Sequence, residues 1–228
     1  MDDARLVALV DENLVAFVRH FGGSTPHAVP GSILWAAAGT AATHGRGYGV
    51  WTRAHADAAL EAILPAGGFL RVVDLPVMVL ETRPEVRPVP DRTQIRAVVD
   101  EAGVGDFRAV DRAAFAAEAG GVAIDSVFRD PARLLHPDVT IVVAYDGEVP
   151  VATAMSFTAL GVTRVAWVGT VPAFRRRGLG DAVTRAAVLA GFDRGATIAA
   201  LESSPAGLDL YRSMGFRQVT TYRIWRIE

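Results

Sequence analysis

The second half of the chain alternates between strand-like and helix-like patterns. Short apolar runs rich in β-branched residues predict strands, and apolar positions at helical spacing predict helices. The Asp146-Gly147 pair between two apolar runs predicts a hairpin turn. Helices are expected over residues 93–103, 106–119, 125–135, 178–194 and 205–214. Strands are expected over residues 140–145, 149–158, 163–171, 197–202 and 220–227.

The first half is less regular. Helices are expected over residues 6–21 and 53–64, and strands over residues 32–38 and 77–81. A proline-rich segment follows, and because proline blocks both helices and central strands, it predicts a linker. The predicted organisation is an N-terminal region at residues 1–82, a linker at 83–90 and a second domain at 91–228.

One strand–turn–helix segment combines features that favour anion binding. An apolar run at residues 165–171 is ended by Pro172, and Arg175, Arg176 and Arg177 stand where the next helix begins. Cations are unfavourable at the positive end of a helix, so three of them predict an anion at this place. Free backbone N–H groups beside glycines would complete a phosphate cradle. The alternative interpretation is a solvated turn before a surface helix, and the segment lacks the P-loop and dinucleotide-binding spacings.

The order Arg175-x-x-Gly178-x-Gly180 after a strand resembles the pyrophosphate-binding motif of the GNAT superfamily, the acyl-CoA-dependent N-acyltransferases. The resemblance extends over about residues 86–228. It implies a mixed α/β sheet, antiparallel at its start, with helices on both faces. It also implies that main-chain groups before the turn pair with the pantetheine arm of acetyl-CoA and polarise its thioester. The expected cofactor-binding residues are Gly169, Thr170, Val171, Arg175, Arg176, Arg177, Gly178, Leu179, Gly180 and Ser204.

A second segment resembles another motif of the same family. Ser204 predicts a helix N-cap, Pro205 a first helical residue and Gly215 a helix end. The Tyr-x-x-x-Gly-Phe pattern from Tyr211 implies that this phenol protonates the departing CoA thiolate. A phenol with a pKa near ~10 is protonated at neutral pH and can donate. The alternative is a packed tyrosine whose hydroxyl has a structural partner.

The general base is the least defined part of the expected mechanism. The strand at residues 164–170 carries no carboxylate, which departs from the commonest family arrangement. Glu202, at the end of the following strand, is the nearest acidic candidate by topology. Glu118 is a second candidate, and Asp209 is expected to face solvent. A water chain or an amine that is already neutral would make a single base unnecessary.

Residues 1–82 resemble a truncated or eroded second copy of the family fold, as in tandem members of the superfamily. The strand at 76–81 before the proline-rich segment is similar to the junction in those proteins. A family-specific helical extension is the equally supported alternative. Residues 1–82 and 120–136 are expected to shape the acceptor pocket, and the first half could equally form a homodimer.

Composition excludes several other classes. The chain has 228 residues, and its 23 Lys and Arg against 25 Asp and Glu leave no basic excess for nucleic acid. The absence of cysteine excludes disulfides, thiolate metal sites and a cysteine nucleophile. The five histidines show no metal-binding spacing, and no Gly-x-Ser-x-Gly motif of a serine hydrolase is present, so we expect no metal.

The chain starts with acidic residues and has no long apolar run, so neither a signal peptide nor a membrane span is expected. The expected location is therefore the cytoplasm. Abundant Arg, Ala, Val and Gly are typical of high-GC bacterial genomes. The function expected from the resemblance is transfer of an acetyl group from acetyl-CoA to a small-molecule amine or a peptide N-terminus. The alternatives are a non-catalytic acyl-CoA-binding or regulatory module and a phosphate- or nucleotide-binding α/β protein.

Overall fold

The computed structural model describes residues 1–21, 49–116 and 130–227. Contacts divide the chain into two units. Unit 1 comprises Met1–Val79 and Glu202–Glu228, and unit 2 comprises Leu80–Leu201. The predicted linker at 83–90 contains neither helix nor strand and belongs to unit 2. The last segment joins the first residues because its strand pairs with two strands of the N-terminal half.

Unit 2 is built on a mixed sheet with the strand order β7-β6-β5-β4-β3. Its strands are β3 (Thr93–Ala97), β4 (Val139–Asp146), β5 (Val149–Ala159), β6 (Val162–Thr170) and β7 (Ile198–Glu202). Strands β3 to β6 pair antiparallel, whereas β6 and β7 pair parallel. Gly147 has a φ of 62° in the turn between β4 and β5, which confirms the predicted hairpin. The expected mixed α/β class is therefore confirmed.

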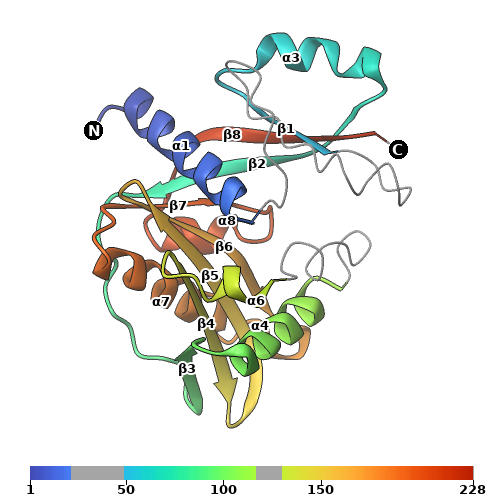
Figure 1. Ribbon diagram of the computed structural model, residues 1–228. Coiled ribbons are helices and arrows are strands. Elements are labelled where there is room, and N and C mark those ends of the chain that lie inside the picture. The colour runs from blue at the N-terminus through green and yellow to red at the C-terminus, as the bar shows by residue number, and fades with distance from the viewer. Residues whose placement is uncertain (22–48, 117–129, 228) are drawn as a thin grey trace. The chain divides into compact units, whose positions relative to one another are not determined.

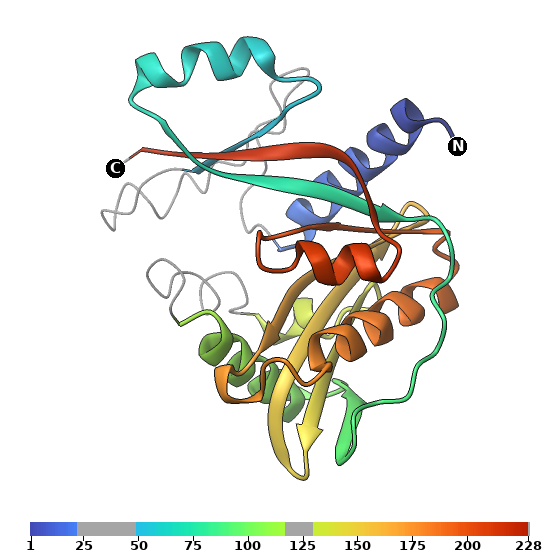
Figure 2. The same cartoon turned by 180° about the vertical axis from the view of Figure 1, so that it is seen from behind.

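Two helices cover the sheet of unit 2. Helix α4 (Glu101–Ala114) and helix α7 (Leu179–Asp193) both contact β4, β5 and β6, and they lie on opposite faces (Figures 1 and 2). The apolar stripe of α7 is buried against small and β-branched side chains of β4 and β5. Short helices α6 (Pro131–Leu134) and η3 (Pro172–Phe174) complete the unit.

Unit 1 contains an antiparallel sheet in the order β1-β8-β2, formed by β1 (Gly49–Arg53), β8 (Arg217–Arg226) and β2 (Leu70–Leu80). Its helices are α1 (Asp3–Phe21), α3 (Ala58–Ile63), η1 (Pro65–Gly67) and α8 (Leu208–Ser213). Successive side chains of a strand point to opposite faces. On β8, Tyr222 donates to Asp11 of α1 at 2.6 Å, whereas Arg223 donates to Glu61 of α3 at 2.5 Å. Helices α1 and α3 therefore cover opposite faces of this sheet.

The predicted helix at 93–103 is wrong. Residues Thr93–Ala97 form edge strand β3, which pairs with β4 from Thr93 opposite Asp146 onward. Helix α4 begins only at Glu101, where the Asp100 carboxylate accepts a hydrogen bond of 2.9 Å from the Gly103 N–H. Tertiary pairing with β4 thus prevailed over a local helical pattern.

Two further helix starts are corrected. Arg53 ends β1, and α3 begins five residues later, because the Asp57 carboxylate accepts from the Arg53 N–H and closes a turn. Helix α8 begins at Leu208 after Gly207, whose N–H donates to the Ser204 carbonyl. Ser204 therefore opens a turn and does not cap the helix. The predicted strand at 32–38 and residues 125–129 of the predicted helix at 125–135 lie outside the described residues, whereas α6 (Pro131–Leu134) falls within the rest of that predicted helix.

Helix α7 and strand β6 approach each other closely at Gly191. A Cβ at Gly191 would lie 2.2 Å from Thr163 Oγ1, whereas a Cβ at Gly105 of α4 would meet nothing within 4 Å. We predict that Gly191→Ala lowers the free energy of unfolding by about 1–3 kcal/mol through overpacking. Gly105→Ala, the matched control at an exposed helix position, should raise it by about 0.5–1 kcal/mol. Urea unfolding measures both, and equal stability of the two variants would contradict the close packing.

Candidate active site

The turn between β6 and α7 ends in a helix N-terminus that no side chain caps. Arg176 and Gly178 adopt left-handed backbone conformations, with φ of 64° and 78°. The first backbone hydrogen bond of α7 runs from the Ala182 N–H to the Gly178 carbonyl. The N–H groups of residues 179–181 therefore have no acceptor within the helix, and such groups bind anions. The side chain of Leu179 is buried in the core, so this residue contributes its main chain.

The three arginines of the turn have different surroundings. Arg175 donates from Nε to the Thr170 carbonyl at 3.1 Å and from Nη2 to the Ala114 carbonyl at 2.8 Å. It thereby ties the end of β6 to the C-terminal end of α4, where a cation is favourable. The guanidinium of Arg177 lies 4.9 Å from the centroid of the Phe174 ring. Arg176 is exposed and makes no hydrogen bond or ion pair with the described part of the chain, so it is the cation available to an anion.

Strand β6 pairs with its parallel neighbour, β7, over a short stretch. Pairing with β7 covers Val162, Thr163 and Arg164 only, among the residues that the structure describes. The pairing with β5 then jumps from Ala166 to Gly169, which defines a bulge at residues 167–168, and Trp167 has a φ of 54°. Bulges redirect a strand, and an unpaired edge can accept an extended ligand as an additional strand. The edge of β6 beyond Arg164 is thus not paired with β7, and it leads to the turn.

The three residues expected to pair with the pantetheine arm already take part in hydrogen bonds or close packing within the protein. The Val171 N–H donates to the Val151 carbonyl at 2.9 Å, and the Thr170 carbonyl accepts from Arg175. Gly169 is buried, and a Cβ there would lie 2.9 Å from the Ala114 Cβ and 3.3 Å from a ring carbon of Phe115. On this face the glycine permits close packing of α4 and does not open a gap.

The structure adds a residue that the motifs did not indicate. Asp111 of α4 is fully buried, and neither carboxyl oxygen has a hydrogen-bond partner among the described residues. Its Oδ1 lies 3.7 Å from the Cβ position of Gly169. Burial raises the pKa of Asp111 to about 8. The signal available in the sequence was an acid at helical spacing within an apolar stripe, three residues before Ala114 and four after Phe107.

The remaining predicted site residues belong to unit 1. Tyr211 of α8 is buried, its ring centroid is 6.0 Å from that of Phe216, and burial raises its pKa to about 12. Glu202 is half-buried at the end of β7, and the Ser204 carbonyl accepts from Ser203. The side chain of Asp209 is almost fully exposed, as expected. Glu118 lies outside the described residues. The turn residues and Asp111 are thus grouped in unit 2, and Tyr211, Glu202 and Ser204 in unit 1.

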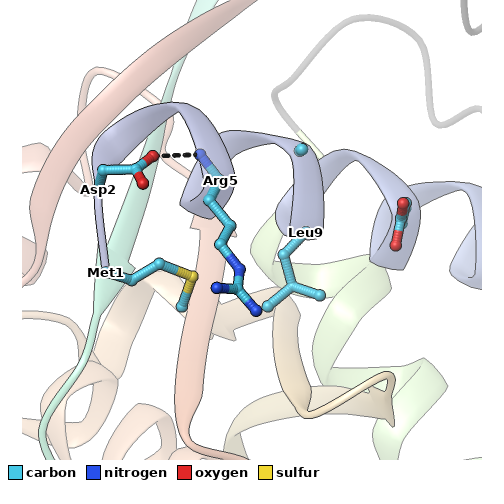
Figure 3. Close-up of a pocket in the computed structure, with 6 residues that line it drawn as sticks. Met1, Asp2, Arg5 and Leu9 are labelled. Atoms are coloured by element: carbon cyan, nitrogen blue, oxygen red, sulfur yellow. Dashed lines mark hydrogen bonds between the residues drawn. The ribbon is translucent and has the colours of Figure 1, made fainter.

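Two surface depressions of unit 1 contain none of the predicted site residues. Figure 3 shows the first, which follows α1 and is lined by Met1, Asp2, Arg5 and Leu9 among others. The second is lined by Ala54, His55, Gln218, Val219, Thr220 and Thr221. Within the described ranges, no three His, Asp or Glu side chains are arranged to hold a metal ion. No helix in those ranges is long and apolar enough to span a membrane.

The open strand edge, the left-handed turn and the uncapped helix agree with the class implied by the sequence. Residues 137–218 match the family model described as "Acetyltransferase (GNAT) domain". The chain therefore contains a GNAT acetyltransferase domain at these residues. The second, N-terminal copy stays a prediction.

Solved structures agree with this assignment. A GCN5-related N-acetyltransferase from Kribbella flavida is 29% identical with a TM-score of 0.64, over 82% of this chain and 70% of that one. One from Sphaerobacter thermophilus is 22% identical with a TM-score of 0.60, over 79% of this chain and 59% of that one, and shows the shared fold. No match was found among curated proteins.

The free guanidinium of Arg176 generates a binding prediction. Arg176→Ala should weaken coenzyme A binding about fivefold, or ~1 kcal/mol, because it removes a cation beside the open helix N-terminus. Arg92→Ala is the matched control, since Arg92 is also an exposed arginine with a φ of 64°. Calorimetric titration should show a loss for the first variant alone. Equal affinities of the two variants would exclude a role of Arg176 in binding.

Arg175 generates a prediction about stability. Arg175→Ala should lower the free energy of unfolding by about 1 kcal/mol, because two charge-assisted hydrogen bonds in a partly exposed setting are lost. Thermal unfolding compared with the Arg176→Ala variant measures the difference. A destabilised Arg176→Ala beside an unchanged Arg175→Ala would contradict the division of roles.

Proposed function

We propose that the protein transfers the acetyl group of acetyl-CoA to an amine by direct attack within a ternary complex. The observation that carries this proposal is the open edge of β6, which leads into the uncapped N-terminus of α7. An extended arm with a pyrophosphate at one end matches that arrangement, because one part needs backbone pairing and the other needs N–H donors. Arg176 supplies the positive charge.

Binding along this edge would align the reacting groups. The pyrophosphate would bind the N–H groups of residues 179–181, and the pantetheine arm would pair with residues 166–169. Orientation of this kind can contribute several kcal/mol to lowering a barrier. A strand N–H near the bulge would donate to the thioester oxygen as negative charge develops on it. These contributions come from the main chain, so they depend on backbone geometry more than on side-chain identity.

Tyr211 is the proposed proton donor to the departing thiolate. In the reaction the amine nitrogen bonds to the thioester carbon, the carbon–sulfur bond breaks, and the sulfur takes a proton. Because burial raises the pKa of Tyr211 to about 12, the phenol is protonated across the neutral and mildly alkaline range. It can therefore donate at any pH at which the amine is a nucleophile. Glu202 and Ser204 retain their predicted roles as base candidate and cofactor contact.

The acceptor is proposed to be an amine of a small molecule or of a peptide N-terminus. Residues 1–82 and 120–136 are the segments expected to select it, and a homodimer through the first half is the alternative role for that region. Fold similarity alone does not define a substrate, so the acceptor is to be found by screening.

The proposal is tested by two measurements on the full chain. Calorimetry with acetyl-CoA measures binding, and a thiol reagent measures release of free CoA when amines are added. The chain contains no cysteine, so every thiol detected belongs to CoA. Binding with amine-dependent thiol release supports the proposal. Binding without release for all amines would instead indicate an acyl-CoA-binding module, and no binding would contradict both functions.

Tyr211→Phe gives a prediction for the proton donor. The variant should lower kcat at least tenfold, since positioned acid catalysis contributes about 10²–10⁴ in rate, and should leave acetyl-CoA affinity within about twofold. Phenylalanine retains the ring that packs near Phe216. Tyr145→Phe is the matched control, because it removes a different partly buried hydroxyl, bonded to Asp106 at 2.7 Å. An unchanged kcat in Tyr211→Phe would assign the tyrosine a packing role.

A further inference from the structure

Asp111 occupies a position where a carboxyl group is energetically costly. It lies on the apolar stripe of α4 with Val104, Phe107, Val110 and Ala114, all of them buried. Both carboxyl oxygens are buried and lack a hydrogen-bond partner among the described residues. Buried polar groups normally have partners, and an unpaired carboxyl is destabilising. A leucine or an alanine would avoid the cost, which suggests that the carboxyl group has a chemical role.

The carboxyl group lies beside the strand segment that would hold the thioester. Asp111 Oδ1 is 3.7 Å from the Cβ position of Gly169, at the end of the bulge in β6. The aromatic ring of Phe115, one turn further along, lies edge-on to Trp167 with centroids 6.1 Å apart. Trp167 is the residue of the bulge with a left-handed backbone. Helix α4 thus places a carboxyl group and a pair of rings against the open part of β6, within one unit.

We propose that Asp111 is the general base that accepts the proton of the attacking amine. This inference rests on the proposed acetyl transfer. Asp111 supplies the carboxylate that strand β6 does not carry. Residues 164–170 contain no Asp or Glu, and Arg164 is the ionisable residue of that stretch. A base must come within hydrogen-bond reach of the nitrogen or across one water molecule, and Asp111 lies beside Gly169, at the end of the strand segment that would hold the thioester.

The proton inventory of the step is balanced. As the amine nitrogen bonds to the thioester carbon, one N–H proton passes to the Asp111 carboxylate, directly or across one water molecule. The carbon–sulfur bond breaks, and the thiolate takes a proton from Tyr211. The products are the amide and the free thiol. Asp111 then releases its proton to solvent, and Tyr211 regains one from solvent.

Burial sets the basicity of the group, and no neighbouring cation offsets it. Desolvation raises the pKa of Asp111 to about 8, close to that of weakly basic amines. Titratable and charged residues on α4 and on the elements that pack against it are Glu101, Asp106, Arg108, Arg112, Arg133, Tyr145, Asp146 and Arg164, with Arg175 at the end of α4; β5 carries none. None of them contributes to the shift, which has burial as its cause.

The pKa of Asp111 also makes stability depend on pH. The folded state keeps the proton up to about pH 8, whereas the unfolded chain releases it near its ordinary pKa of about 4. The unfolded state thus binds fewer protons across this window, so the free energy of unfolding falls as pH rises through it. Asp111→Asn preserves size and cannot titrate. It should therefore lose this part of the pH dependence and be the more stable protein above pH 8.

The test compares wild type, Asp111→Asn and a control in thiol release from acetyl-CoA with primary alkylamines of graded pKa. Asp106→Asn is the control, because Asp106 is a carboxylate of the same helix whose partner is the Tyr145 hydroxyl. We expect Asp111→Asn to lower kcat about a hundredfold, to keep acetyl-CoA affinity within about twofold and to lose the rise in rate near pH 8. Asp106→Asn should retain the wild-type rate and pH profile.

Each outcome has a distinct meaning. A folded Asp111→Asn variant with wild-type kcat and an unchanged pH profile would overturn the base assignment and leave acetyl transfer intact. A decrease in kcat with an unchanged pH profile would also overturn it, since that pattern indicates a structural effect. Wild type that binds no acetyl-CoA, or binds it and acetylates no amine, would refute the proposed function and this inference with it.

Discussion

The geometry of unit 2 depends on how closely two helices approach one strand. On one face of the sheet α7 contacts β6 at Gly191, where any side chain would overlap Thr163. On the other face α4 contacts β6 at Gly169, where a Cβ would crowd Ala114. Two glycines, one on a helix and one on the strand, thus permit both approaches. Because close-packed layers transmit small displacements, the position of β6 is set from both sides.

The candidate site is formed by the second half of β6, beyond its pairing with β7. The strand separates from β7 after three paired residues, bulges at Trp167 and enters the turn that begins α7. Arg175 spans from the strand end to α4, so the side chain that is predicted to bind phosphate also connects these two elements. The two non-glycine residues with left-handed backbones, Trp167 in the bulge and Arg176 in the turn, store strain of about 1–3 kcal/mol each, a cost typical of functional sites.

Burial acts on two titratable groups in ways that suit opposite roles. It raises the pKa of Tyr211 to about 12, which preserves a proton donor, and that of Asp111 to about 8, which yields a base stronger than an ordinary carboxylate. Desolvation penalises the charged form of both groups. The same physical effect therefore keeps both groups protonated to a higher pH than usual, and their pKa values stay apart because the ordinary values differ by about six units.

The sequence by itself determined the features that depend on local chemistry. The strand–turn–helix unit with Gly178, the hairpin at Gly147 and the helix end at Gly215 follow from residue conformational preferences, and the GNAT domain follows from the spacing of the turn residues. Contacts between distant residues were decided only by the tertiary structure. Edge pairing made residues 93–97 a strand, β8 joined the first strands of the chain, and helix packing brought Asp111 to Gly169. Local patterns carry no information on such partners, because pairing and burial depend on segments that meet only in the folded chain.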